Sequence, residues 1–254
     1  MKTITLPVYK RADRLRKTLE CLKACEPSGY TLYVQAEPDF DEVVSIAKAI
    51  DWIPVSLKVN GSRLGLNANI KTVLWRAMSD GSEFNIALED DLLLSKDAVR
   101  LADWFKAGPV DQYACMGFCA FKSDASRPGV IRETQDFRSW GYCFGKSSWQ
   151  KYFVPALEFR YNIDPTVKHQ DMWDFWVQFY LVMNGIPTIH PVLSRSNHAG
   201  IDDGTNSIPE IKRYFDEMVM SDGSFKGPYT IEKLPESIWE HARKLSAERL
   251  KAAV

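Results

Sequence analysis

The chain has 254 residues, of which 45% are hydrophobic, and it contains 8 Trp, 13 Phe and 10 Tyr. This composition excludes wholesale disorder and provides for a large core, so we expect one large α/β domain with an appended segment. The formal net charge of -1 excludes non-specific nucleic-acid binding by the surface as a whole. The net charge of the whole chain does not exclude a local basic patch, because the first 25 residues hold seven Lys or Arg and two acids.

The N-terminus, MKTITLPVY, lacks the apolar region of a secretory signal, and no stretch reaches the roughly 18 apolar residues that a membrane span requires. We therefore expect a cytoplasmic protein without a membrane span. The five cysteines, an odd number, are expected to be reduced thiols. Cys21/Cys25 and Cys115/Cys119 have a spacing of four, but no pair of histidines accompanies them, so buried cysteine is favoured over a zinc site.

The first half of the chain alternates strand patterns with helical spacing of apolar residues. The expected strands are 3–8, 30–36, 55–59 and 84–89. The expected helices are 11–25, 41–50, 66–77 and 95–107. This alternation predicts a largely parallel sheet with helices on both faces.

Beyond residue 110 the pattern changes to short strands with bulky aromatics, in YACMGFCAF (113–121) and FRSWGYCFG (137–145). A helix at 169–184 and a strand at 186–190 follow, so this half is expected to be mixed or antiparallel. From about residue 206 the chain is polar, and helical stretches near 208–219 and 235–252 flank the Gly/Pro/Ser-containing segment SDGSFKGP.

Three consecutive acids, Glu89, Asp90 and Asp91, follow the fourth expected strand in IALEDDLLLS. They are expected at the carboxyl edge of the strands, where open α/β sheets bind ligands. Adjacent carboxylates repel one another unless a cation lies between them, and Mg²⁺ or Mn²⁺ in such sites takes one or two carboxylates plus substrate phosphates. The acids are thus a candidate site for a metal and a diphosphate. The alternative is a solvated turn whose acids favour the dipole of the next helix.

The segment IALEDDLLLS also resembles the Glu-Asp-Asp motif of the N-acetylglucosaminyltransferase I family of GT-A-fold glycosyltransferases. The resemblance implies a GT-A-like α/β fold, with a mostly parallel central sheet flanked by helices. It implies a Mn²⁺ or Mg²⁺ cofactor bound by Asp91, the last acid of the DXD-like motif. Glu89 and Asp90 would contact the ribose or the sugar of a nucleotide sugar.

A second resemblance lies downstream. Residues 172–200, MWDFWVQFYLVMNGIPTIHPVLSRSNHAG, resemble that family's Trp-Asp-Asp-Trp stretch. Together with SWGYCF (139–144) and GTN (204–206), they also resemble segments of bacterial family-2-type glycosyltransferases. The resemblance implies a GT-A-type domain over 1–205, in which 1–110 bind the nucleotide sugar and 111–205 form the acceptor side. A helical extension, 206–254, would pack on that domain.

Inverting sugar transfer needs a base on the acceptor side of the anomeric carbon, and a carboxylate within hydrogen-bond reach of the acceptor hydroxyl suffices. In the expected helix 169–184, Asp171, Asp174 and Gln178 share one face. We expect Asp174 to be the catalytic base, because it matches the Asp of the family's Trp-Asp segment, with Asp171 second. The alternative is that both acids cap or solvate the start of the helix.

Fold analogy predicts further contacts with the donor and the acceptor. The expected donor-binding residues are Pro7, Tyr9, Arg11, Glu37, Arg63, Asn67, Asn69, Glu89, Asp90 and His198. Arg63, Arg195 and His198 are candidate cations for the leaving group. The expected acceptor-binding residues are Trp140, Gly141, Tyr142 and Trp173. Aromatic faces stack on sugars, and Gly141 allows a close approach.

These patterns predict a metal-dependent, inverting glycosyltransferase that uses a nucleotide-sugar donor, expected to be a UDP-sugar. The acceptor hydroxyl stays open among a glycan, a lipid-linked sugar, a protein and a modified DNA base, and we expect a bacterial or viral enzyme. A two-ion phosphoesterase or nucleotidyltransferase using Asp90, Asp91, His198, Asp202 and Asp203 is one alternative. A non-catalytic carbohydrate-binding module with structural Ca²⁺ is another.

Overall fold

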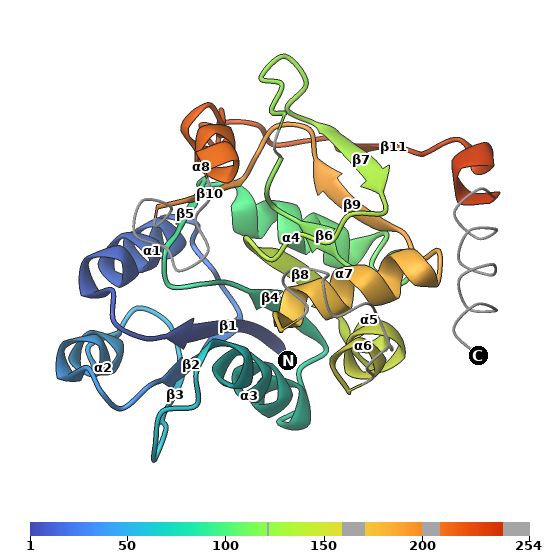
Figure 1. Cartoon of the computed structure of the whole chain (residues 1–254). Coiled ribbons are helices and arrows are strands. Elements are labelled where there is room, and N and C mark those ends of the chain that lie inside the picture. Colours follow the sequence, from blue (N-terminus) through green and yellow to red (C-terminus); the bar gives the residue numbers. More distant parts are fainter. Residues whose placement is uncertain (121, 159–170, 200–208, 241–254) are drawn as a thin grey trace.

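A computed structural model of the chain describes residues 1–120, 122–158, 171–199 and 209–240. The strands are β1 (Lys2–Val8), β2 (Tyr30–Ala36), β3 (Val55–Val59), β4 (Phe84–Ala87), β5 (Leu92–Leu94), β6 (Met116–Gly117), β7 (Val130–Thr134), β8 (Tyr142–Gly145), β9 (Thr188–Pro191), β10 (Ser196–His198) and β11 (Thr230–Glu232). The helices are α1 (Ala12–Ala24), α2 (Asp41–Lys48), α3 (Leu66–Ser79), α4 (Ala98–Ala107), α5 (Lys146–Ser148), the π-helix η1 (Trp149–Phe153), α6 (Val154–Glu158), α7 (Trp173–Met183) and α8 (Pro209–Asp216). They form an α/β fold (Figure 1).

Within the described residues, the central sheet has nine strands in the order β11-β7-β9-β6-β8-β4-β1-β2-β3. The first four strands of the chain are mutually parallel, with β1 between β2 and β4, as the alternation of strand and helix patterns predicts. The second half is mixed: β8 runs antiparallel to β4 and to β6, and β9 runs antiparallel to β7. The α/β fold class with a mixed second half is therefore confirmed.

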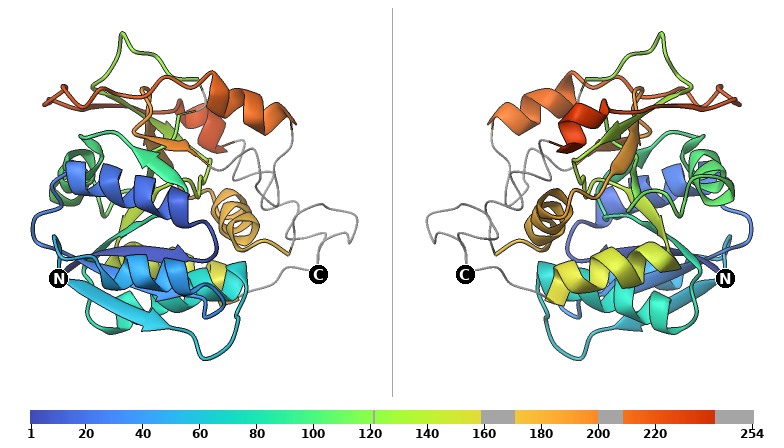
Figure 2. Two further views of the ribbon diagram at one scale, coloured as in Figure 1. Left: turned by 90° about the vertical axis from the view of Figure 1, so that its left-hand side faces the viewer. Right: turned by 90° about the vertical axis from the view of Figure 1, so that its right-hand side faces the viewer.

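Helices cover both faces of the sheet (Figure 2). Apolar side chains of α1, α2 and α4 pack in one core cluster with Ile4, Leu6 and Val8 of β1. On the other face, α3, α6 and α7 pack around Tyr142 and Phe144 of β8. Successive strand residues point to opposite faces, so β8 contributes to both clusters, with Cys143 in the first and Tyr142 and Phe144 in the second.

Several predicted elements are shorter in the structure, for local reasons. The expected strand 137–145 is reduced to β8, because Gly141 has φ +81° and the chain turns immediately before Tyr142. The expected helix 169–184 begins only at Trp173. The Asn67 side chain accepts a hydrogen bond from the Trp173 N–H (3.0 Å) and donates to the Asp171 carbonyl (2.7 Å), so it caps this helix from outside.

The segment that leads to the C-terminus packs against the sheet edge, where β11 pairs in parallel with β7. The Glu133 carboxylate accepts hydrogen bonds from Trp239 Nε1 (2.8 Å), the Leu234 N–H (3.2 Å) and the Tyr113 hydroxyl (3.0 Å). Of the two helices predicted after residue 206, the first is α8. The second is helical over 236–240, and its remainder lies outside the described residues.

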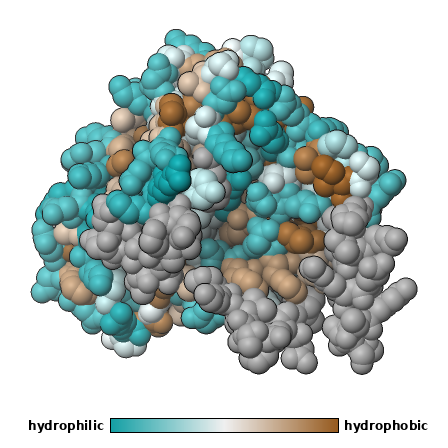
Figure 3. Space-filling view, turned by 45° about the horizontal axis from the view of Figure 1, so that its top comes forward, coloured by the Kyte–Doolittle hydropathy of each residue, from teal (hydrophilic) through white to brown (hydrophobic). Residues whose placement is uncertain are grey.

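Among the residues that the structure describes, none of the helices combines the length and the hydrophobicity needed to cross a bilayer. Figure 3 shows mostly hydrophilic residues on one face, interrupted by small hydrophobic patches. All five cysteines are free thiols, and four of them are buried.

Arg195, a sequence candidate for a cation at the leaving group, is fully buried and paired with Asp97. Its Nε and Nη2 atoms both lie 3.1 Å from Asp97 Oδ2, and its Nη1 and Nη2 atoms donate to the carbonyls of Leu193 and Pro128. Every guanidinium nitrogen is therefore engaged inside the protein, and its role in this structure is to join the β9–β10 connection to α4.

We expect Arg195→Met to lower the free energy of unfolding by about 3–5 kcal/mol, because it removes the closest cation of the buried Asp97 and leaves only Arg100, 3.9 Å away. Urea unfolding measures the change. Lys146→Met is the matched control, since Lys146 pairs with Glu83 on the surface (2.8 Å) and its loss should cost less than about 1 kcal/mol. Equal costs for the two variants would contradict the structural role of Arg195.

Candidate active site

The acidic run lies at the carboxyl edge of the parallel strands. After β4, the Leu88 N–H still bonds the Thr5 carbonyl of β1 (2.9 Å), and the chain then leaves the sheet. Beyond the end of β1, the Tyr9 N–H donates to Asp90 Oδ2 (3.0 Å). The acids therefore lie at the carboxyl edge of the sheet, as expected from the sequence.

A short antiparallel pair brings His198 to the acids. The apolar run Leu92–Leu94 forms β5 and pairs with β10, so that His198 lies opposite Leu92. The Ala199 N–H donates to the Asp91 carbonyl (2.7 Å), and His198 Nε2 lies 3.4 Å from Asp91 Oδ2. The β5–β10 pairing thus sets the distance between the imidazole and the carboxylate.

Glu89, Asp91 and His198 each offer one ligand atom, and these three atoms lie within 4.8 Å of one another. Asp91 is 3% exposed, and its Oδ1 atom is buried without a hydrogen-bond partner among the described residues. A buried carboxylate oxygen without a partner is costly unless a cation or a donor meets it. Two carboxylates and one imidazole form a donor set that fits a divalent ion such as Mn²⁺.

The crowding of acids alters their titration. Burial, followed by the charges of Asp174 and Asp90, raises the pKa of Glu89 to about 8, and the positive charge of Arg11 partly opposes that rise. Burial also raises the pKa of Asp90, against the hydrogen bond from the Tyr9 N–H. A divalent cation between these groups would favour their charged forms.

Arg11 immediately precedes α1, and its Nη1 atom makes an ion pair with Asp91 Oδ2. The Arg11 side chain is 22% exposed and that of Asp91 is 4% exposed. One Asp91 oxygen therefore has two basic neighbours, the Arg11 guanidinium and the His198 ring. Fold analogy assigned Arg11 to the donor, and the contact with Asp91 comes from the tertiary structure.

Asp174 lies in the first turn of α7, and its charge is among those that raise the pKa of Glu89. The Ser139 hydroxyl donates to Asp174 Oδ2 (3.2 Å), while Asp174 Oδ1 accepts from the Phe175 N–H (3.0 Å). Asp171 lies before the helix and is exposed. The two acids therefore do not share a helix face, contrary to the expectation from their spacing.

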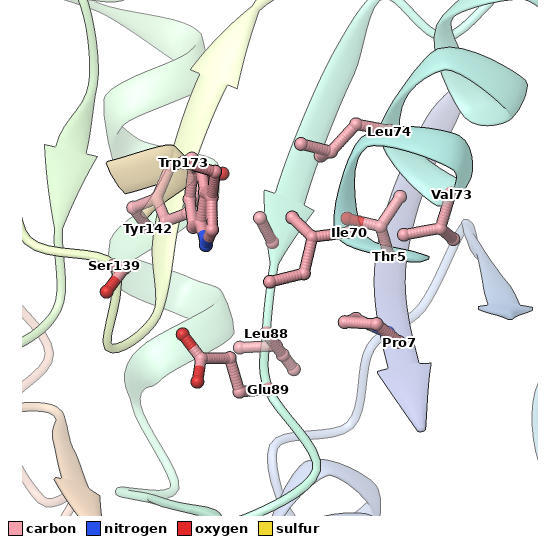
Figure 4. A pocket seen from close by; sticks show the side chains of 11 residues that line it. Thr5, Pro7, Ile70, Val73, Leu74, Leu88, Glu89, Ser139, Tyr142 and Trp173 are labelled. Atoms are coloured by element: carbon pink, nitrogen blue, oxygen red, sulfur yellow. The ribbon is translucent and has the colours of Figure 1, made fainter. Parts of the chain in front are cut away.

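A small cavity adjoins these acids, between the sheet and α3 (Figure 4). Ile70, Val73 and Leu74 of α3 form one wall, and Pro7 and Thr5 of β1 lie along another. The rest of the lining comes from Ala87, Leu88, Glu89, Ser139, Tyr142 and Trp173. In Figure 4 the carboxylate of Glu89 points toward the Ser139 side of the cavity, so the hollow joins Glu89 to the surroundings of Asp174.

The remaining expected donor-binding residues, away from the acidic run, fall into two groups, of which the first lies near the ends of β1 and β3. The Tyr9 ring contacts Phe40 edge-on (5.0 Å between centroids), and the Arg63 guanidinium lies 4.7 Å from the Tyr9 ring centroid. Pro7 lines the cavity, and the Asn67 amide bridges α3 and the start of α7.

Glu37 and Asn69 form the second group, which is internal. Glu37 is 2% exposed, and its carboxylate accepts from the N–H groups of Leu64 and Gly65 and from Asn60 Nδ2. Asn69 Nδ2 donates to the Gln35 carbonyl (3.2 Å), and Asn69 Oδ1 accepts from Asn60 Nδ2 (2.9 Å). These side chains hold the loop that enters α3, where Gly65 has φ +80°.

The expected acceptor-binding residues also lie in two different environments. Tyr142 and Trp173 are 2% and 4% exposed, and both line the cavity; the Tyr142 hydroxyl is buried without a partner among the described residues. Trp140 instead packs edge-on against Phe215 of α8 (5.0 Å between centroids). At Gly141, a Cβ would lie 3.1 Å from Phe118 Cδ2, so close packing as well as positive φ favours glycine.

Two residues of the site were not singled out from the sequence. Ser139 bonds Asp174 and lines the cavity, and its place directly before Trp140 in RSWGY was the available signal. Phe215 packs against both Trp140 and His198, with ring centroids 5.0 and 5.5 Å apart, and no motif marks it. Asp202 and Asp203, proposed for a two-ion alternative, lie outside the described residues.

No model of a known protein family matches the sequence, and no curated protein sequence matches it significantly. Solved structures do match. The crystal structure of S. aureus TarS 1-349 is 10% identical, with a TM-score of 0.52 over 87% of this chain and 67% of that chain. The chain has a GT-A-like fold.

Two further solved structures resemble the GT-A-like chain less closely. A mannosyltransferase from Pyrobaculum calidifontis, in complex with GDP-Man and Mn²⁺, is 15% identical, with a TM-score of 0.45 over 99% of this chain and 74% of that chain. TarS 1-349 in complex with UDP-GlcNAc is 15% identical, with a TM-score of 0.37 over 50% and 36% of the two chains. At these identities the likeness concerns the fold, and function depends on the site.

Proposed function

We propose that this GT-A-like protein is a metal-dependent glycosyltransferase that moves a sugar from a nucleotide-diphosphate donor to an acceptor hydroxyl. One observation carries the proposal: ligand atoms of Glu89, Asp91 and His198 converge within 4.8 Å at the carboxyl edge of the sheet. This edge is where open α/β sheets bind their ligands. The likeness to the fold of TarS, which has been solved with UDP-GlcNAc, supports a UDP-sugar as the donor.

Asp91, Glu89 and His198 would hold the divalent ion, and we propose Mn²⁺ rather than Mg²⁺, because an imidazole ligand suits Mg²⁺ poorly. When bound, such an ion acts as a Lewis acid that stabilises the charge of the leaving diphosphate. Asp90 is held by the Tyr9 N–H, which orients it beside this group.

For the donor, we propose that Tyr9 and Arg63 offer a stacking surface to the nucleotide base, because their side chains already stack on one another near the edge of the sheet. Arg11 supplies positive charge on the diphosphate side. Glu37 and Asn69 act indirectly in this scheme: their side chains are bonded within the protein, and they shape the loop that carries Arg63.

On the acceptor side, we propose Asp174 as the base of an inverting reaction. Its Oδ2 atom is oriented by the Ser139 hydroxyl, and the cavity lined by Ser139, Tyr142 and Trp173 adjoins it. A carboxylate held in this way would accept the proton of the attacking hydroxyl as the new glycosidic bond forms. The apolar lining would limit the access of water, which competes with the acceptor.

This scheme divides the chain at the places expected from the sequence. Residues 1–110 would bind the nucleotide sugar, 111–205 would form the acceptor side, and 206–254 would be an extension on the same domain. Contacts of Phe215 with Trp140 and His198 support the view that the extension completes the site.

A thermal-shift panel of nucleotide sugars, with and without Mn²⁺, tests the proposal. We expect a UDP-sugar to raise the melting temperature in the presence of Mn²⁺, since a ligand that binds the native state stabilises it. The selected donor should then yield free UDP and a glycosylated product with a suitable acceptor. Release of phosphate from simple esters, without sugar transfer, would instead indicate a phosphoesterase.

A further inference from the structure

An arginine already lies at the candidate metal ligand. Arg11 Nη1 is paired with Asp91 Oδ2, the oxygen that also lies 3.4 Å from His198 Nε2. Asp91 Oδ1, on the same carboxylate, is buried without a partner among the described residues. The positive charge of Arg11 therefore balances a nearly buried carboxylate whose other basic neighbour is the His198 ring.

The position of Arg11 allows its side chain to leave without unfolding the helix. Arg11 immediately precedes α1, and its backbone carbonyl accepts the first helical hydrogen bond, from the Leu15 N–H (2.9 Å). The backbone thus has its own structural role, which does not depend on the guanidinium. The side chain is 22% exposed, so solvent is within reach of a displaced guanidinium.

We propose that Arg11 is an internal counter-cation of the metal site, which pairs with Asp91 in the metal-free protein and must release it when a divalent ion binds. This inference rests on the metal site of the proposed function. Two cations at one carboxylate oxygen repel each other, and the repulsion is stronger near a buried group than in water. Metal affinity is therefore set by a competition, and the released guanidinium becomes available to the negative charge of a bound diphosphate.

The competition predicts the direction in which the affinity for Mn²⁺ changes when Arg11 is replaced. A residue that only supports the fold would weaken metal binding when it is replaced, whereas a competing cation strengthens binding when its charge is removed. We expect Arg11→Gln to bind Mn²⁺ at least about fivefold more tightly than the wild type, an effect at the low end of ordinary coupling between sites. The free-Mn²⁺ signal in electron paramagnetic resonance, titrated without nucleotide, gives both dissociation constants.

Arg16→Gln is the matched control, in the helix that Arg11 precedes. Arg16 pairs with Asp13 (3.0 Å) and Glu42 (2.7 Å) at the surface, so its replacement removes an equal charge from α1 without touching the acidic run. We expect its Mn²⁺ affinity to equal that of the wild type. The melting temperatures of all three proteins in EDTA and in Mn²⁺ give a second readout, in which Mn²⁺ should stabilise Arg11→Gln more than the wild type.

The outcomes separate this inference from the proposed function. Equal or weaker Mn²⁺ binding by Arg11→Gln would contradict the competition between Arg11 and the ion. The proposed transferase function would still hold if the wild type binds Mn²⁺ and a donor. Tighter binding by Arg11→Gln with no donor in the panel would support the competition and count against the transferase. An absence of Mn²⁺ binding by all three proteins would overturn both.

Discussion

Asp91→Asn should abolish the Mn²⁺-dependent rise in melting temperature and lower turnover by about 10³-fold or more. The substitution keeps the shape of the side chain but replaces a charged ligand oxygen by a neutral amide. Asp91 contributes the ligand with the least exposure, at 3%, and one of its oxygens has no partner within the described part of the chain. Thermal shift with and without Mn²⁺, followed by steady-state transfer assays, measures both effects.

Glu83→Gln is the control for this experiment. Glu83 directly precedes β4, whereas Asp91 follows it, and Glu83 pairs with Lys146 at the surface (2.8 Å). Its replacement should leave the Mn²⁺ response and turnover as in the wild type. A full Mn²⁺ response in Asp91→Asn would show that the ion, if bound, is held elsewhere, and the proposed site would then be wrong.

Asp174→Asn should keep donor and Mn²⁺ binding and lower the rate of transfer by about 10²–10⁴-fold, the usual contribution of a general base. An amide cannot accept the proton of the acceptor hydroxyl, but its oxygen can still accept the hydrogen bond from Ser139 (3.2 Å in the structure). The loss should therefore fall on turnover rather than on stability. Single-turnover transfer at saturating donor measures it.

Asp171→Asn is the matched comparison, since Asp171 is a nearby acid that is exposed and lies outside α7. We expect its rate to equal that of the wild type. Normal transfer by Asp174→Asn together with a loss in Asp171→Asn would move the base to Asp171. Normal transfer by both variants would exclude a base from this segment.

Much of the fold follows from local patterns. The four parallel strands, β1 to β4, were predicted because apolar alternation and helical spacing are local properties of 10 to 15 residues. The short strands were predicted less well: β6 has two residues, and β5, β7, β10 and β11 were not predicted. Such strands are fixed by their partners, and a run such as Leu92–Leu94 has no period that distinguishes strand from helix.

The sequence by itself determined that three acids follow a buried strand, and hence that they lie at the ligand-binding edge of a parallel sheet. The tertiary structure decided which side chains contact these acids. The register of β5 with β10 brings His198 to Asp91, and the turn into α1 brings Arg11 to the same Asp91 oxygen. It also turned Glu37 inward, where backbone N–H groups bind its carboxylate. These contacts join segments far apart in the chain, and their geometry depends on packing and register, which local spacing does not encode.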